Sequence, residues 1–259
     1  MKAYAGPEYV DCVYLPAADV EATCEWYAKH FNLPATRGDV LLPGNRAMFL
    51  LNPTEPGRTS NFHTTGSLNE MFALCFETNQ IEELYEKLVR SGVPVESMQD
   101  EGDGGLQFVF VDPNGNKFQV RQSPASDTQP MQENVPALLR ISGISVPVTD
   151  SEASTDWYIR HLHMKRSAAG KPMTNDGVLL SMEVMRDSGT TSNFATTGWT
   201  EGGAYMPLMN FKITGLRMLF EELRADGVRT TEINDFGFGW AFKIYDPDGN
   251  MIEVWEPKP

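Results

Sequence analysis

The chain contains two copies of one sequence pattern, and this duplication constrains its fold more than any other feature. DVEATCEWY, at residues 19–27, recurs as DSEASTDWY at 150–158. SNFHTTG, at 60–66, recurs as SNFATTG at 192–198, and DPNGN, at 112–116, recurs as DPDGN at 246–250. Three matches in the same order and at nearly constant spacing indicate a tandem duplication of one domain. Two copies with so long a period do not make a solenoid.

The two copies are separated by a segment with the composition of a linker. Residues 123–135, SPASDTQPMQENV, are mostly polar, include two prolines and show no apolar period. We therefore predict a first domain at residues 1–122, a linker at 123–135 and a second domain at 136–259.

Each copy has the same predicted order of elements. A short alternating strand is followed by a helix that Asp19 or Asp150 caps, and then by further strands, including 47–51 and 178–184. A second strand–helix unit begins at Met71 and at Met206, and its helices, 81–91 and 216–225, end before Gly92 and Gly227. The pattern predicts an α+β fold in which each domain contains two βαβββ modules.

The DPxGN motif predicts a hairpin with a three-residue loop, because proline suits the first turn position and glycine the left-handed one. Pairing Asp112 with Asn116 places Phe108 and Phe110 opposite Val120 and Phe118, which makes one face apolar. The other face carries Gln107, Val109, Gln119 and Arg121, and its counterpart in the second copy carries Ala241, Lys243, Glu253 and Trp255. We expect the apolar faces to pack on helices and the mixed faces to line whatever the curved sheets enclose.

Charge and cysteine content exclude several classes of protein. The formal net charge of -14 argues against a nucleic-acid partner and against an anionic membrane surface. The three cysteines have no CxxC spacing, so neither a disulfide framework nor a thiol zinc site is expected. No apolar run is long enough to span a membrane, and the first residues lack a signal peptide's apolar segment, so we expect a cytoplasmic protein.

Paired βαβββ modules, the strand–Asp–helix–WY start and the DPxGN hairpin resemble the vicinal oxygen chelate superfamily, which includes glyoxalase I, extradiol dioxygenases and bleomycin-resistance proteins. The resemblance implies a divalent metal held by His, Gln or Glu on several strands. Carried over by position, the ligands fall on Cys12 and Gly143, Met71 and Met206, a site near Leu50 and Met182, and Gln119 and Glu253. Only Gln119 and Glu253 suit a hard metal ion, so no cofactor is expected, and a divalent metal is the alternative.

Glu253 is the strongest catalytic candidate, because a general base is often a carboxylate in an apolar pocket. Its alternative role is a cross-strand ion pair with Lys243, which the hairpin register places opposite. Cys12 is interpreted as a buried thiol rather than a nucleophile, since no basic partner is near it in the sequence. The predicted ligand-binding residues are Cys12, Tyr14, Met71, Gln107, Gln119, Arg121, Met206, Lys243, Glu253 and Trp255.

Three functional hypotheses follow. The first is a non-catalytic or weakly catalytic protein that binds a small, partly apolar or aromatic molecule, as the bleomycin-resistance branch implies. The second is a metal-dependent lyase or dioxygenase with rearranged ligands that include Glu253 and Gln119. The third is an interaction protein whose pockets are filled by its own side chains. The duplication is expected to form an internal domain pair, with a homodimer also possible.

Overall fold

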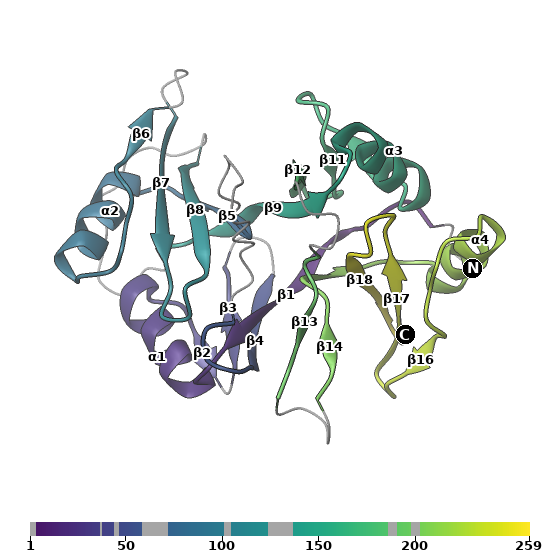
Figure 1. The fold of residues 1–259 in the computed structure, drawn as a ribbon, viewed down its shortest axis with the longest axis horizontal. Helices are drawn as coiled ribbons and strands as arrows, with labels where there is room; N and C mark the ends of the chain where they lie inside the picture. The colour runs from purple at the N-terminus through teal and green to yellow at the C-terminus, as the bar shows by residue number, and fades with distance from the viewer. Residues whose placement is uncertain are drawn as a thin grey trace.

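The computed structural model describes residues 4–36, 38–43, 47–58, 72–100, 105–123, 137–185, 191–197 and 203–259. Over these residues the chain is mixed α and β, with two large curved sheets and helices packed against them (Figure 1). The helices are α1 (Val20–Phe31), α2 (Ile81–Arg90), α3 (Ser151–His161) and α4 (Leu216–Ala225).

The first large sheet, called sheet A here, has eight strands. Its order is β16-β17-β18-β15-β1-β4-β3-β2. The strands are β1 (Tyr9–Ala17), β2 (Ala35–Thr36), β3 (Asp39–Leu41), β4 (Met48–Pro53), β15 (Met209–Lys212), β16 (Asn234–Asp235), β17 (Gly239–Tyr245) and β18 (Met251–Pro257).

The second large sheet, sheet B, repeats this plan with the order β10-β11-β12-β9-β5-β8-β7-β6. Its strands are β5 (Leu74–Thr78), β6 (Gln99–Asp100), β7 (Leu106–Val111), β8 (Lys117–Gln122), β9 (Arg140–Val148), β10 (Lys165–Arg166), β11 (Pro172–Met173) and β12 (Leu179–Val184). A small hairpin, β13 (Phe194–Ala195) with β14 (Tyr205–Met206), forms a separate two-stranded sheet.

Each large sheet takes half of its strands from each half of the chain. In sheet A, β1 pairs antiparallel with β15, which joins the first module to the fourth. In sheet B, β5 pairs antiparallel with β9, which joins the second module to the third. The two sequence copies therefore form an internal pair by sharing sheets. The boundaries predicted at 1–122 and 136–259 remain predictions, and residues 124–136 lie outside the described part of the chain.

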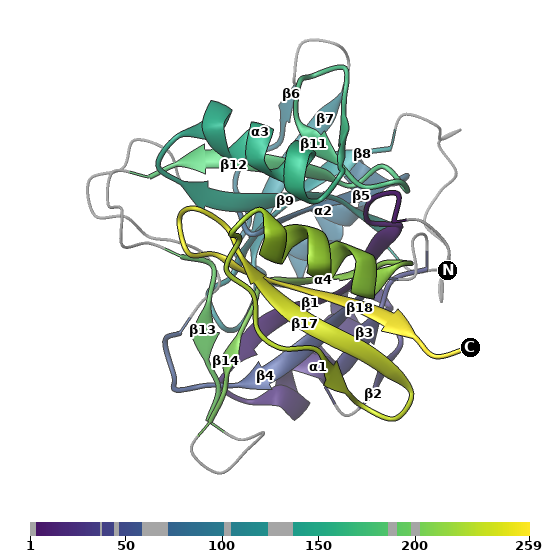
Figure 2. The ribbon, with the colours of Figure 1, turned by 90° about the vertical axis from the view of Figure 1, so that its right-hand side faces the viewer.

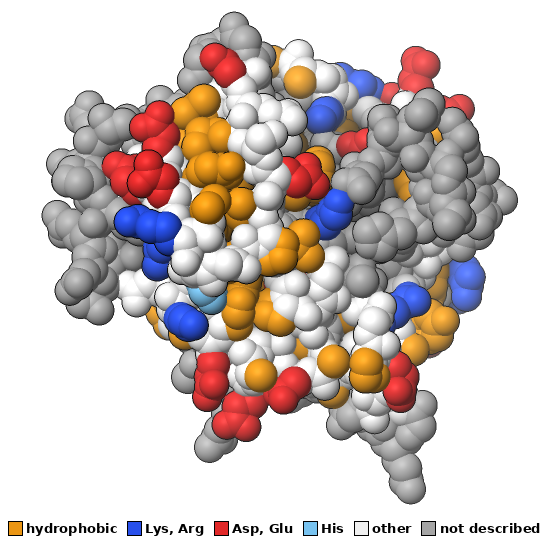
Figure 3. Space-filling view, turned by 60° about the vertical axis from the view of Figure 1, so that its left-hand side comes forward, with side chains coloured by type: hydrophobic (Ala, Val, Ile, Leu, Met, Phe, Trp, Pro, Cys, Tyr) orange, Lys and Arg blue, Asp and Glu red, His pale blue; other side chains and the backbone are white. Residues whose placement is uncertain are grey.

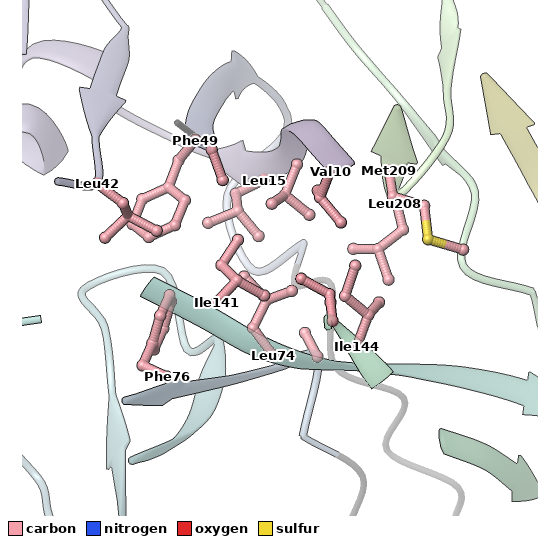
Figure 4. Packing of buried hydrophobic residues seen from close by; sticks show 14 of the residues in the cluster. Val10, Leu15, Leu42, Phe49, Leu74, Phe76, Ile141, Ile144, Leu208 and Met209 are labelled. Atoms are coloured by element: carbon pink, nitrogen blue, oxygen red, sulfur yellow. The ribbon is translucent and has the colours of Figure 1, made fainter. Parts of the chain in front are cut away.

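One hydrophobic core spans both sheets. Leu15 and Phe49 of sheet A face Leu74 and Phe76 of sheet B, and the rings of Phe49 and Phe76 lie 5.4 Å apart (Figure 4). Helices α1 and α4 contact sheet A, whereas α2 and α3 contact sheet B; α3 and α4 appear on the near side of the molecule in Figure 2. No helix of the described residues covers the opposite face of either sheet, and we call it the open face.

The repeated WY and DPxGN motifs meet in a buried polar cluster in each copy. Tyr27 donates to Asp112 Oδ2 at 3.1 Å, and Asn116 Nδ2 donates to the same oxygen at 2.9 Å. In the second copy, Tyr158 and Asn250 bind Asp246 Oδ2 at 3.0 and 2.8 Å. Burial raises the pKa of both carboxyl groups, and these hydrogen bonds partly offset that effect. Each cluster ties the first helix of a copy to its closing hairpin.

The cluster also reaches the first strand of its own copy. The Asn116 amide donates to the Pro16 carbonyl oxygen at 3.4 Å, and the Asn250 amide donates to the Pro147 carbonyl oxygen at 2.7 Å. Since Pro16 and Pro147 lie in β1 and β9, the motif connects a hairpin to a strand of the other large sheet. A single repeated motif therefore links the two sheets twice.

Most local predictions agree with the structure. Asp19 and Asp150 cap α1 and α3, and Gly92 and Gly227 take positive φ values of 73° and 75°. The hairpin registers are confirmed, with Gln107 opposite Arg121 and Lys243 opposite Glu253.

The predicted starts of the second units are displaced. Strand β15 begins at Met209 rather than Met206, and β5 begins at Leu74. Met206 lies in the small β13–β14 hairpin, and Met71 lies outside the described residues. An apolar residue just before a strand cannot be told from the strand itself by periodicity.

Within the described residues no helix is long and apolar enough to cross a membrane. On the face shown in Figure 3, the described Lys and Arg side chains are scattered among acidic and apolar ones and form no continuous basic patch. This distribution agrees with the net charge of -14.

Because Tyr27 and Tyr158 donate to buried carboxylates, Tyr27→Phe and Tyr158→Phe should each lower the free energy of unfolding by about 1–2 kcal/mol. Urea unfolding followed by fluorescence measures the loss. Tyr205→Phe is the matched control, since Tyr205 is exposed, and it should change stability by less than about 0.5 kcal/mol. Equal stability of all three variants would show that the clusters do not hold the fold.

Candidate functional site

The open face of sheet A brings together residues from both ends of the chain. Alternation along β1 points Val13 and Leu15 into the core, so Cys12 and Tyr14 lie on the open face. Asn210 of β15 is paired with Cys12 on one side and with Glu253 of β18 on the other. The central row of this face therefore contains side chains of three adjacent strands from the first and fourth modules.

Glu253 is the polar centre of this face. Its Oε2 atom accepts hydrogen bonds from the Tyr14 hydroxyl at 2.7 Å and from Asn210 Nδ2 at 2.8 Å. Among the described residues, no donor binds the second oxygen, Oε1. The carboxylate is thus held at one oxygen and keeps the other for a further partner.

The expected ion pair between Glu253 and Lys243 does not form among the described residues, although the two are directly opposite in the register. Lys243 Nζ instead donates to the Tyr205 carbonyl oxygen at 3.0 Å. Cross-strand neighbours need not interact when a nearby backbone acceptor offers the long lysine chain an alternative. The closer partners of Glu253, Tyr14 and Asn210, come from strands distant in the sequence.

An apolar cluster lies beside this carboxylate and reaches it through Tyr14. Cys12, Tyr14 and Phe194 form a buried cluster, and Met48, Leu50 and Met206 pack against it. Phe194 and Met206 belong to the β13–β14 hairpin, which lies over the open face near β1 and β18 in Figure 1. The predicted binding residue Met206 is therefore at the site, but it reaches the site from above the sheet rather than from within it.

The segment that carries Phe194 is fastened to the surrounding structure. Asn193 Nδ2 donates to the Gly249 carbonyl oxygen at 2.9 Å, and Met251 N donates to Asn193 Oδ1 at 2.7 Å. Thr197 N donates to the Pro53 carbonyl oxygen at 2.7 Å. The repeated SNFATTG motif thus anchors a covering hairpin to the DPDGN loop and to the end of β4.

Trp255 extends the face beyond Glu253 along β18. Its indole side chain lies near Asp11, which occupies a bulge between Val10 and Cys12 in the pairing of β1 with β15. Burial raises the pKa of Asp11, while the Trp255 side chain and the Lys212 ammonium partly offset this effect. Lys212 itself forms an ion pair with Glu8.

Cys12 is placed in an environment that suppresses thiolate chemistry. The side chain is buried, and desolvation raises the thiol pKa well above its ordinary value. Burial likewise raises the pKa of the Tyr14 phenol, so Tyr14 stays protonated and donates to Glu253. The polar chemistry of the face therefore rests on Glu253 and Asn210.

The predicted binding residues Gln107, Gln119 and Arg121 lie on sheet B, away from Glu253, and Met71 lies outside the described residues. Gln119 Nε2 donates to Gln107 Oε1 at 2.5 Å, and Arg121 is paired with Gln107 across the β7–β8 hairpin. In the parallel pairing of β5 with β8, Glu77 lies opposite Arg121. The predicted set thus divides between two open faces.

Sequence reasoning missed Asn210, because it placed the start of the strand three residues too early. In β15 and β18, Asn210 is paired with Glu253, just as Cys75 is paired with Gln119 in β5 and β8. Asn210 and Cys75 therefore occupy the equivalent positions that the sequence pattern assigns to Met206 and Met71. A strand start at Met209 would have placed Asn210 on the same face as Glu253.

The residues at the expected metal positions do not form a donor set for a divalent ion. On sheet A they are Cys12, Leu50, Asn210 and Glu253, which include one carboxylate, and that carboxylate already accepts two hydrogen bonds. On sheet B, Cys75 lies between Gly143 and Gln119 in the strand register, and Met182 packs against the core. Across the described ranges, no group of three or more His, Cys, Asp or Glu side chains is placed to hold a metal ion.

Comparison with solved structures finds the same architecture in other proteins. Glyoxalase I from Zea mays has a TM-score of 0.66 and 14% identity, with 96% of this chain and 92% of that chain covered. A proposed dioxygenase from Bacillus subtilis has a TM-score of 0.65 and 10% identity, with 98% and 86% covered. At these identities the likeness establishes the fold alone.

No curated protein sequence matches this chain. Residues 9–120 and 140–254, however, match the family described as Glyoxalase/Bleomycin resistance protein/Dioxygenase superfamily, and these two segments cover both sequence copies. Together with the shared-sheet fold, this match shows that the chain belongs to the glyoxalase/bleomycin resistance/dioxygenase superfamily.

Proposed function

We propose that the protein binds a small, partly apolar or aromatic molecule on the open face of sheet A, without the metal site of its family. The observation that carries this proposal is the Glu253 carboxylate, which Tyr14 and Asn210 hold at one oxygen next to an apolar cluster. A mostly apolar wall with a few oriented polar groups is the usual composition of a small-molecule site.

Burial around the carboxylate supports binding rather than a closed core. Cys12, Tyr14 and Asn210 are buried, whereas Glu253 and Trp255 are only partly covered. A ligand that approaches Trp255 would therefore reach Glu253 beside the hairpin that carries Phe194. The third hypothesis, a face filled by the protein's own side chains, fits the end of the face near Phe194 but not the end near Trp255.

A metal-dependent lyase or dioxygenase is the second reading, and the donor set does not favour it. Leu50 cannot ligate, Cys12 is held as a thiol, and Glu253 stands alone as a carboxylate among these positions. The family relatives named above show that the fold accommodates such enzymes, but a fold hosts many activities.

A panel of antibiotics and aromatic metabolites, screened by thermal shift, should contain compounds that raise the melting temperature. For such a compound, Trp255→Ala and Glu253→Gln should each weaken binding at least about tenfold by calorimetry, because each loses a main contact of the site.

Gln119→Ala is the matched control for this experiment, since Gln119 occupies on sheet B the register position of Glu253. It should leave the affinity unchanged. Binding that depends on Gln119 and not on Glu253 would move the site to sheet B and contradict the proposal.

Adding Ni²⁺, Zn²⁺, Mn²⁺, Fe²⁺ or Mg²⁺ to chelator-stripped protein should not raise the melting temperature, because a specific site would stabilise the folded state by mass action. A rise with one of these ions that disappears in Glu253→Gln would instead support the metal-dependent enzyme.

A further inference from the structure

The Asn210 side chain has a buried acceptor with no donor. Asn210 is 6% exposed, and its Oδ1 atom is buried without a hydrogen-bond partner among the described residues. An unsatisfied buried polar atom destabilises the folded state, so such atoms are uncommon unless a ligand or solvent completes them.

The orientation of this amide is set by its neighbour. Asn210 Nδ2 donates to Glu253 Oε2 at 2.8 Å, and rotating the amide by 180° would place two acceptor oxygens against each other. The carboxylate therefore holds the NH₂ group toward itself and turns Oδ1 away from it. The unpaired oxygen is a consequence of the Glu253 contact and not an arbitrary rotamer.

Two acceptors on adjacent strands of sheet A are consequently left without a hydrogen-bond donor among the described residues. One is Asn210 Oδ1, and the other is Glu253 Oε1, since Tyr14 and Asn210 both bind Oε2. Adjacent strands place the two side chains next to each other in the register. A partner for both must present at least two donors, and the carboxylate favours a positive charge on it.

The nearby lysines do not reverse this preference. Lys212 is paired with Glu8, and Lys243 donates to the Tyr205 carbonyl oxygen. Asp11 adds a second carboxyl group beside Trp255.

An aromatic surface continues from the two acceptors along β18. Trp255 follows Glu253 by two residues on the same face, a spacing of about 7 Å along a strand. The Phe238 ring lies 6.4 Å from the Trp255 ring, and Phe236 stacks on Phe238 at 6.2 Å. Phe236 and Phe238 are 55% and 71% exposed, an unusual arrangement for two neighbouring aromatic side chains.

The turn that carries these two rings is held by specific contacts. Asp235 accepts from Lys258 Nζ at 2.7 Å and from Gly237 N at 2.8 Å. Lys258 N donates to the Phe238 carbonyl oxygen at 2.8 Å. The backbone below the rings is thus fixed before a ligand arrives, which reduces the entropy lost on stacking.

We infer that the site recognises an aromatic molecule that bears an amidinium or guanidinium group. Two N–H groups of the cation donate to Glu253 Oε1 and Asn210 Oδ1, and the ring lies against Trp255 and the Phe238 side of the face. This inference rests on the proposed function and names the class of ligand for that same site.

Benzamidine, benzamide and benzoate form a matched series for testing this inference, because they share one ring and differ in charge and donors. Titrations by calorimetry in the presence of a chelator, with amide NMR shifts at residues 210 and 253, measure affinity and location. Benzamidine should bind at least about tenfold more tightly than benzamide, and benzoate should bind more weakly than either.

Variants separate the two parts of the site. Glu253→Gln and Asn210→Leu should remove most of the preference for benzamidine over benzamide, whereas Phe238→Ala should weaken both compounds equally. If Asn210→Leu does not fold, as near-ultraviolet circular dichroism will show, Glu253→Gln and the ligand series still decide the question.

Equal binding of all three compounds at residues 210 and 253 would overturn the inferred ligand class and leave the proposed binding function intact. Binding of none of them would also overturn it. In that case the screen of antibiotics and aromatic metabolites tests the binding function separately.

Discussion

The antiparallel pairing of β1 with β15 is the contact on which the candidate site depends. It joins the first module to the fourth, and it places Cys12 beside Asn210 and Asn210 beside Glu253. Without it, Tyr14 and Glu253 would lie on separate sheets, and their 2.7 Å hydrogen bond could not form. The same kind of pairing, between β5 and β9, builds the second large sheet from the other two modules.

The buried Tyr–Asp–Asn clusters give this exchange of strands a fixed geometry. Each cluster joins a helix and a strand of one module to the closing hairpin of the next, and the two large sheets therefore cannot shift independently. Burying a carboxylate is costly, and the hydrogen bonds from backbone and side chains compensate it only where the helix, the strand and the turn are all in place. The duplicated motifs are thus structural first, and the site is built on the frame that they hold.

The two open faces have diverged although they share one plan. At equivalent register positions sheet A has Asn210 and Glu253, whereas sheet B has Cys75 and Gln119. Sheet A is lined by Cys12, Tyr14 and Phe194, and sheet B by a hydrogen-bonded glutamine pair and Arg121. A duplicated chain can keep its fold while one face changes, because the core side of each strand carries the packing and the open side does not.

The helix caps, the turns and the alternation of faces could all be predicted, because each depends on residues within a few positions of one another. Asp19, Gly92 and the DPxGN hairpins behave as their local chemistry requires, and the repeat itself predicted two equivalent halves. The exchange of modules between sheets, the role of Asn210 and the covering position of Phe194 became visible only in the folded chain. Backbone hydrogen bonds are alike for any two strand edges, so local sequence does not state which edges pair. That choice is made by the packing of the whole core, and it decides which side chains meet at the site.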